Sequence, residues 1–448
     1  MPSCTKMIDV TSRQVLLFCA TSRIITILLQ VVFNHVIPDH DHSMRDVFWH
    51  GRREPPPYNW LVDLLVGGFT RWDSEWLLHV AHHGYQYEQC VAFFPLYPLM
   101  VHVLYRLASP WVPLLHDKDI ILVCGVCVNI CAFLLAGLVL FKLTNQMFHN
   151  PRLSHMTIIL FCINPAIVFM TTTYTESLFT LLVFTGLWAL HNDLTWTSAI
   201  IFSLATLTRS NGIILSGYLV WYYWVKCGST LTVWCIMLIK LAIQVSMVTS
   251  GFVGFQWYSY WLFCHHDIPT PSGWCKHTIP ISYSYVQRKY WDVGFMSYYQ
   301  VKQIPNFLLA TPTISLCSYW LYCCCHSNWR QVKQIYHWYW SNSHLIPYMA
   351  HMTFLLMFGV TSMHVQVITR MIYSSTPLVY WCGAVTIMES IPTLNWPSDN
   401  TSLPYQCVTL CKHLWSTKGC YVAKTIVTSY LLYCVIGTLL HCNYYPWT

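Results

Sequence analysis

The most polar stretch of this sequence contains the residues best suited to chemistry. Eight of the 17 acidic residues fall between Asp39 and Glu88, in a chain that is otherwise apolar. Asp73 lies in this stretch, and a carboxylate held there could act as a general base that takes a proton from an acceptor hydroxyl. Such a group is worth about 10²–10⁴ in rate. Asp73 also fits a helix capping box with Thr70, so the spacing alone leaves both roles open.

Two further ionisable residues interrupt apolar runs. Glu176 follows Thr175 in a strongly apolar setting, and Arg209 breaks another apolar run. An ionisable group at membrane depth costs about 2.5–3.5 kcal/mol on insertion scales, so it is usually paired or functional. Glu176 could instead belong to a helix start that Thr175 caps. For Arg209 we predict a pairing with a lipid phosphate or with Glu176.

A third group of residues places cations beside aromatic rings. Arg288 and Lys289 precede Tyr290 and Trp291, and Asp292 follows them. Cations suit a phosphate group and flat aromatic faces suit a sugar, so the cluster is a candidate binding site for a sugar phosphate. The alternative is an aromatic belt at a membrane surface with snorkelling cations.

The histidines after Asp73 have a spacing that can place metal ligands on one helix face. His79, His82 and His83 are related as i, i+3 and i+4. No other residues complete a coordination sphere, so the sequence favours packing or hydrogen bonding for these rings. We therefore predict no metal site.

Many of the 21 cysteines lie inside apolar runs, and we interpret them as small buried apolar residues. Cys124 and Cys127 have redox or zinc spacing, but they lie in a run of membrane-spanning length without a second ligand pair. Cys264 and Cys275 differ, because they bracket a polar loop. They could form a disulfide if that loop faces the lumen.

The composition shows what kind of fold must position these residues. The chain of 448 residues is 55% hydrophobic and only 9% charged, whereas a soluble domain carries about 25% charged residues. Several apolar runs reach membrane-spanning length, and they are too continuous for β-barrel strands. We therefore predict an all-α polytopic membrane protein. The net charge of +7 is scattered along the chain, which argues against a nucleic-acid partner.

The apolar runs predict about nine to twelve membrane spans in a single integral membrane domain over residues 1–448. Residues 38–91 and 264–302 are two long polar loops, and Thr70 to His83 within the first loop reads as a helix on the membrane surface. Residues 92–107 form a short span or a re-entrant piece. The other predicted spans cover residues 15–37, 119–143, 155–172, 176–191, 197–225 (broken near Arg209), 230–263, 303–325, 344–368, 371–389 and 421–441.

Cations between the runs predict the orientation of the chain. Lys6 and Arg13 precede the first span and place the N-terminus in the cytosol, so both long polar loops face the lumen. Lys142 and Arg152 favour a cytosolic connection between two later spans, as do cations near Lys412. These assignments agree only if residues 92–107 do not cross the membrane.

Ten short motifs in this order resemble one family, the GPI mannosyltransferase 2 enzymes of glycosylphosphatidylinositol (GPI) anchor biosynthesis. Each motif is weak alone, but together they extend over nearly the whole chain. They are Arg71-Trp72-Asp73, His83-Gly84-Tyr85, Ala92-Phe93-Phe94-Pro95, Asn164-Pro165-Ala166, Tyr174-Thr175-Glu176-Ser177, Thr208-Arg209-Ser210-Asn211-Gly212, Tyr290-Trp291-Asp292, Lys302-Gln303-Ile304-Pro305, His364-Val365-Gln366 with Thr369-Arg370, and Leu440-His441-Cys442-Asn443.

The resemblance implies a GT-C type glycosyltransferase of the endoplasmic reticulum membrane with a luminal active site. Such an enzyme takes mannose from dolichyl-phosphate mannose and joins it by an α-1,6 bond to the first mannose of the GPI lipid intermediate. Trp72 and Asp73 match the family's catalytic Trp-Asp pair. The substrate-binding residues that the resemblance and the charge pattern suggest are Arg71, Glu176, Arg209, Asn211, Arg288, Lys289, Trp291, Asp292, Lys302, Gln303, His364, Gln366 and Arg370.

The chemistry of this donor agrees with the predicted residues. The donor is a β-linked sugar phosphate and the product is α-linked, so the anomeric centre inverts in one displacement. Asp73 would be the base, and Arg209, Arg288, Lys289 or Arg370 would steady the leaving phosphate. The donor carries no sugar-nucleotide diphosphate, so we expect neither a catalytic metal nor a tightly bound cofactor.

Two other functions stay open at this point. Glu176 and Arg209 within apolar runs would also suit a lipid or solute transporter, although the sequence shows no inverted repeat. A different mannosyltransferase with the same donor, for instance one of N-glycan assembly, has the same composition. A small accessory membrane subunit is likewise left open.

Overall fold

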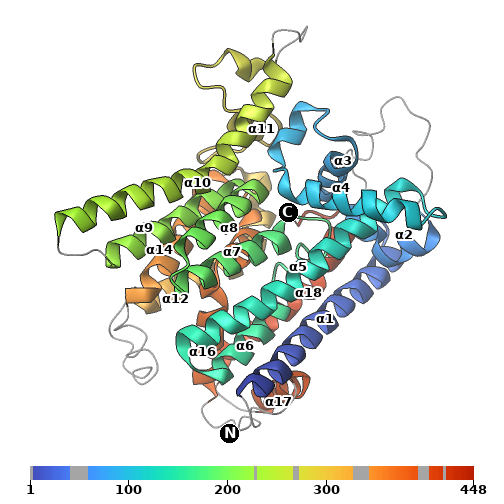
Figure 1. Ribbon diagram of the computed structural model, residues 1–448. Helices are drawn as coiled ribbons and strands as arrows, with labels where there is room; N and C mark the ends of the chain where they lie inside the picture. Colours follow the sequence, from blue (N-terminus) through green and yellow to red (C-terminus); the bar gives the residue numbers. More distant parts are fainter. Residues whose placement is uncertain are drawn as a thin grey trace.

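The structure is a computed structural model that describes residues 4–40, 59–226, 230–265, 272–325, 343–391, 403–416 and 420–447. Within these ranges α- and 3₁₀-helices are the only regular elements, as predicted (Figure 1). The α-helices are α1 (Cys4–Val36), α2 (Trp60–Val66), α3 (Asp73–His83), α4 (Leu96–Ala108), α5 (Asp117–Phe148), α6 (Pro151–Cys162), α7 (Glu176–His191), α8 (Thr195–Thr208), α9 (Ser216–Val225), α10 (Leu231–Cys264), α11 (Ser282–Trp291), α12 (Ile304–Cys325), α14 (Ile346–Ser362), α15 (Val367–Ser375), α16 (Leu378–Ser390), α17 (Leu403–Ser416) and α18 (Tyr421–Cys442).

Several of these helices can cross a membrane, so the protein is a multi-pass membrane protein. Among the described residues, five helical stretches are long and apolar enough to span: Ser12–Val36, Asp117–Phe148, Leu231–Cys264, Val301–Cys324 and Tyr421–Cys442. Four apolar helices are shorter: Trp60–Thr70, Glu176–His191, Thr195–Thr208 and Ile346–Ser362. The total of nine to twelve spans stays a prediction.

The first two long helices run in opposite directions. Cys19 on α1 lies where a side chain on Gly137 of α5 would be, and the guanidinium of Arg23 lies 3.6 Å from the ring centre of Phe133. The end of α1 and the start of α5 therefore lie at the same end of the bundle, together with α2, α3 and α4 (Figure 1). Because α3 and the start of α5 lie at this same end, α4, which has 13 residues, does not cross the bundle between them. Of the two predictions for residues 92–107, the structure therefore does not support the membrane-crossing span.

The same end of the bundle carries α11, from the second long polar loop, whereas the start of α1 and α17 lie at the opposite end (Figure 1). This arrangement agrees with the predicted sidedness of both loops. The second loop contains the predicted disulfide between Cys264 and Cys275, whose Cα atoms are 5.5 Å apart. Lys289 and Tyr290 of α11 donate to Glu88 Oε2 at 2.8 and 2.6 Å, which fastens the second loop to the first.

Three predicted spans were wrong in their bounds, one of which is the span at 344–368, because α14 already ends at Ser362 and α15 begins at Val367. The span at 155–172 ends at Cys162, because Pro165 cannot continue the helix. Residues 163–175 are irregular yet buried, and Arg23 Nη1 donates to Ile167 O at 3.3 Å and to Thr171 Oγ1 at 2.8 Å. Irregular backbone is tolerated at membrane depth where protein groups satisfy it in this way.

The span at 371–389 is two helices, α15 and α16, separated at Pro377. The predicted break near Arg209 is confirmed.

The predicted helix from Thr70 and its capping box were also wrong. Thr70 lies in a 3₁₀ turn, where its hydroxyl donates to Gly67 O at 2.8 Å, and α3 begins only at Asp73. Trp72 precedes the helix with φ 60° and ψ −127° and makes no side-chain cap. Asp73 is thus the first residue of α3, and its carboxylate is available for other partners.

Candidate active site

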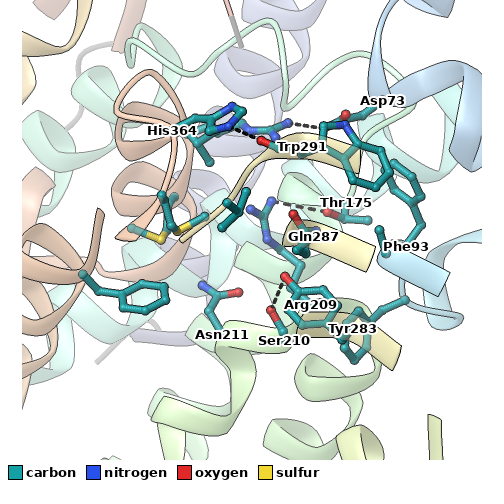
Figure 2. Close-up of a pocket in the computed structure, with 18 of the residues that line it drawn as sticks. Asp73, Phe93, Thr175, Arg209, Ser210, Asn211, Tyr283, Gln287, Trp291 and His364 are labelled. Carbon is teal, nitrogen blue, oxygen red and sulfur yellow. Dashed lines mark hydrogen bonds and ion pairs between the residues drawn. The ribbon is translucent and has the colours of Figure 1, made fainter. Parts of the chain in front are cut away.

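A cavity of about 970 Å³ opens between α3, α7, α10, α11, α14 and α15, and it contains the centre of the candidate site. Figure 2 shows Asp73, Trp291 and His364 on one side of it, and Ser210, Asn211 and Tyr283 on the other. The lining is polar near Asp73. The lining also includes apolar side chains from three other elements, namely Ile213, Ile214, Phe252, Phe354 and Phe358.

Four charged side chains form a continuous chain of ion pairs along the polar side. Arg370 Nη1 lies 2.7 Å from Asp73 Oδ2, and Arg370 Nε lies 3.8 Å from Glu176 Oε1. Arg209 Nη1 completes the chain with an ion pair to the same Glu176 oxygen. The Glu176 side chain is fully buried, which such pairing makes tolerable. The predicted pairing of Arg209 with Glu176 is therefore confirmed.

Helix ends position most of these charges. Asp73 and Glu176 are the first residues of α3 and α7, where the helix dipole favours a carboxylate. Arg209 is the C-cap of α8, where the dipole favours a cation. The predicted capping of α7 by the Thr175 hydroxyl does not occur. That hydroxyl instead accepts a hydrogen bond from Arg209 Nη1 at 3.3 Å.

Asp73 has one carboxylate oxygen engaged and one available. Oδ2 accepts from Arg370, whereas Oδ1 accepts no hydrogen bond from any residue in the described ranges. The side chain is 27% exposed and lines the cavity. The backbone N–H of Asp73 donates to Tyr174 Oη at 3.2 Å, which fixes the start of α3 against the irregular segment. A group that enters the cavity could therefore donate a hydrogen bond to Oδ1.

Aromatic rings form the wall beside Asp73. The ring of Trp291 lies edge-on to Trp76 and to Phe93, with centroids 6.3 and 6.1 Å away. His364 Nε2 donates to Trp291 O at 2.6 Å, and Tyr298 stacks on the His364 ring at 4.4 Å. Trp291 is thus held at the end of α11, where it lines the cavity, and an aromatic ring at this position suits contact with a sugar ring.

Most of the sequence-predicted site residues come together in this cavity. Those that line it are Trp72, Asp73, Glu176, Arg209, Asn211, Trp291, His364, Gln366 and Arg370. The remaining predicted residues, which do not line it, are Arg71, Arg288, Lys289, Asp292, Lys302 and Gln303.

Each residue outside the cavity has another environment. Arg71 Nη2 pairs with Asp39 Oδ2 at 3.1 Å, and Gln303 accepts from Asn306 at 2.6 Å. The hydrogen bond to Glu88 raises the pKa of Lys289 above its usual range. Asp292 ends α11 with a left-handed φ of 52°. The side chains of Arg288 and Lys302 are exposed.

Sequence reasoning missed three cavity residues on α11, namely Tyr283, Ser284 and Gln287. Tyr283 accepts a hydrogen bond from Ser210 Oγ at 2.9 Å, and Gln287 lies one helical turn further on. Their i, i+4 spacing places them on one helix face, which is the only signal the sequence offered. The three histidines of α3 lie outside the cavity, where His82 Nδ1 and His83 Nε2 are 2.9 Å apart. Burial, with smaller contributions from its two histidine neighbours, lowers the pKa of His79 to about 4.

Comparison with known proteins identifies the family. The family described as "Mannosyltransferase (PIG-V)" matches residues 12–448. The chain belongs to this family. Its membership confirms the resemblance seen in the motifs and the assignment as a glycosyltransferase, and it leaves no support for the transporter alternative.

Relatives within the PIG-V mannosyltransferases match over the full length. A protein from Rattus norvegicus named GPI alpha-1,6-mannosyltransferase 2 is 34% identical over 99% of this chain and 100% of its own. The protein of the same name from Homo sapiens is 35% identical over 98% and 99% of the two chains. A GPI mannosyltransferase 2 from Drosophila melanogaster is 28% identical over 95% and 98%.

Proposed function

We propose that this protein transfers mannose from dolichyl-phosphate mannose to the first mannose of the GPI precursor, with formation of an α-1,6 bond at the luminal side of the endoplasmic reticulum membrane. Its full-length similarity to proteins named for this linkage supports the product. The observation that carries the proposal is the Asp73 carboxylate, which faces a large cavity with one oxygen held by Arg370 and the other free to accept a proton.

The shape and polarity of the cavity suit a lipid-linked sugar. A sugar phosphate would lie among the charges of Asp73, Arg209 and Arg370 and beside the ring of Trp291. The lipid chain would contact apolar lining residues such as Phe252 and Phe354. A volume of about 970 Å³ is at the upper end for small-ligand sites, as two substrates would require.

The proposed reaction is one inverting displacement. Asp73 Oδ1 accepts the proton of the acceptor hydroxyl while the hydroxyl oxygen attacks the anomeric carbon of the donor mannose. The bond from that carbon to the phosphate oxygen breaks, and its electron pair leaves with dolichyl phosphate. Arg370 orients Asp73, because its guanidinium holds the Oδ2 atom of the carboxylate at 2.7 Å and leaves Oδ1 directed to other partners.

The leaving phosphate gains negative charge, and the cavity offers two cations to receive it. Arg209 and Arg370 both line the cavity, whereas Arg288 and Lys289 do not. Arg209 adjoins Ser210 and Asn211 in sequence, and its guanidinium points toward Thr175, between that side of the cavity and Asp73 (Figure 2). A donor phosphate bound at Arg209 would place its mannose between Arg209 and the base, as in-line attack requires. A monophosphate flanked by guanidiniums needs no metal for charge neutralisation, so we propose a metal-independent reaction.

Complementation tests the function. Cells that lack the second mannosylation step would receive this chain or, as a positive control, the Homo sapiens relative. We expect this chain to restore GPI-anchored protein at the cell surface and to convert the one-mannose GPI intermediate into the two-mannose form. Equal expression in the endoplasmic reticulum without conversion would contradict the proposal. A change in N-glycan mannose instead would favour the other mannosyltransferase class.

A further inference from the structure

We infer that Tyr444 is a positioning residue for the proposed base, an inference that rests on the proposed function of Asp73. Tyr444 follows the last helix, α18, and has a φ of 59°. Tyr445 N donates to Leu440 O at 2.9 Å, the long bond of a Schellman motif with Tyr444 at the left-handed position. Glycine is usual there, because a side chain costs about 1–2 kcal/mol in this conformation. A tyrosine at such a position indicates a need for its side chain.

The side chain of Tyr444 reaches the residues on both sides of Asp73. Its hydroxyl donates to Glu75 Oε1 at 2.5 Å, and its ring lies 4.6 Å below the guanidinium of Arg71. The ring also packs against Trp72, with centroids 6.0 Å apart. Tyr444 therefore contacts residues 71, 72 and 75 and supports the start of α3 without lining the cavity itself.

The turn that carries Tyr444 is itself fixed in the structure. Arg71 Nε donates to Cys442 O at 3.2 Å, and His40 N donates to Asn443 O at 2.9 Å. Trp447 is only 4% exposed, and its ring lies so close to Gly437 that a Cβ there would come within 2.8 Å of it. A rigid turn of this kind can hold α3 in one position.

The same turn supports the partner of Asp73. The Trp447 ring stacks on Phe169, with centroids 6.3 Å apart and planes within 5°. The guanidinium of Arg370 lies 5.5 Å from the centre of the Phe169 ring. Tyr444 thus braces the helix of the base, and Trp447 braces the cation that orients it. Each member of the Asp73–Arg370 pair is therefore connected to residues 443–447 through one intervening residue, Trp72 for Asp73 and Phe169 for Arg370.

Backbone strain next to the base explains why such support matters. Trp72 has a φ of 60°, and a residue held in an unfavourable region costs about 1–3 kcal/mol unless its surroundings enforce it. Trp72 and Tyr444 are both strained, and their rings are in contact. Removal of the Tyr444 side chain takes away one of the contacts that hold Trp72 at this φ, and a shift of Trp72 would move the adjacent Asp73.

Three purified variants test this inference: Tyr444→Phe, Tyr444→Leu and the matched control Tyr445→Phe. Tyr445 adjoins Tyr444, but its ring stacks on His40 instead of α3. We expect Tyr444→Phe to lower kcat about 3- to 10-fold, as loss of one hydrogen bond of typical strength would do. Tyr444→Leu should lower kcat up to about 100-fold, because a misplacement near 1 Å can have that effect. The KM for the donor should change little, and Tyr445→Phe should resemble the parent.

Hydrogen exchange in the same proteins separates this inference from the proposed function. The Asp73 amide, which donates to Tyr174, should exchange faster in Tyr444→Leu than in Tyr445→Phe. If the parent transfers no mannose but exchange accelerates in this way, the proposed function fails and the bracing of Asp73 stands. Unchanged exchange with unchanged kcat in Tyr444→Leu would overturn the inference. Lower protein stability with normal kcat per folded molecule would also overturn it, since that result indicates a structural role only.

Discussion

Arg370 on α15 lies 2.7 Å from Asp73 on α3, although 297 residues separate them in sequence. The contact joins the first long polar loop, which we predict to face the lumen, to α15 in the C-terminal part of the chain. It also leaves Asp73 with a single oxygen that can receive a proton. In the proposed reaction this pair orients the base before any substrate binds.

Arg370→Lys should therefore impair catalysis although it keeps the positive charge. The planar guanidinium reaches Asp73 through Nη1 and Glu176 through Nε, whereas an ammonium is a point charge that cannot bridge both. We expect a loss of about 10- to 100-fold in mannose transfer by microsomes at saturating donor. Arg288→Lys is the matched control, because Arg288 is exposed outside the cavity and should retain full activity. The opposite ranking of these two variants would remove Arg370 from the mechanism.

Glu176→Gln should mainly affect folding. The substitution leaves Arg209 and Arg370 beside each other around a neutral, fully buried side chain. Removal of one partner from a buried ion pair destabilises a protein by about 3–5 kcal/mol. We expect low abundance and a lower thermal midpoint in detergent. The double variant Glu176→Gln with Arg209→Gln should recover part of the loss. A double variant less stable than the single one would contradict the account of this ion pair.

The all-helical membrane fold could be predicted from the sequence, and so could one of the ion pairs in the cavity, between Glu176 and Arg209. Glu176 and Arg209 stand out because charged residues are rare in apolar runs, and their pairing follows from that cost. The contact between Asp73 and Arg370 could not be predicted, since no local pattern records which helix ends meet. The sequence also could not show that Lys289, beside aromatic rings, faces Glu88 instead of the cavity.

The bounds of the elements failed for physical reasons that are visible in retrospect. The apolar run after Cys162 continues past Pro165, so hydrophobicity suggested a longer helix than the backbone can form. Burial of the irregular segment depends on Arg23, a cation from a helix far away in sequence. Thr70 looked like a helix cap because its spacing from Asp73 is right, but the strained Trp72 starts the helix later.

The predicted orientation can be tested by glycosylation mapping. A sequon introduced near Pro56, which lies outside the described residues, should be modified in the endoplasmic reticulum, because α3 and α11 lie at the end of the bundle opposite the start of α1. A sequon in the N-terminal tail before Arg13 should stay unmodified. The reverse result would place the cavity on the cytosolic side and exclude a luminal reaction.

The choice of control for the base follows from the structure. Glu75 is close to Asp73 in sequence, but it accepts a hydrogen bond from Tyr444, so its substitution would disturb α3. Asp63 on α2 belongs to the same polar segment, and its side chain is exposed. Asp63→Asn therefore matches the charge change without touching the cavity, and it should retain normal activity.

The measurement that tests the account most directly is mannose transfer by Asp73→Asn, normalised to the amount of folded protein. Asparagine keeps the shape of the side chain and an oxygen that can accept from Arg370, and Arg370 also keeps the charged Glu176 3.8 Å away. The lost charge at the start of α3 then costs about 0.3–1 kcal/mol. Its amide cannot accept the acceptor's proton, so transfer should fall about 10²–10⁴-fold. We predict near-normal abundance with accumulation of the one-mannose GPI intermediate. Reduced abundance with full activity per molecule would contradict the assignment of Asp73 as the base.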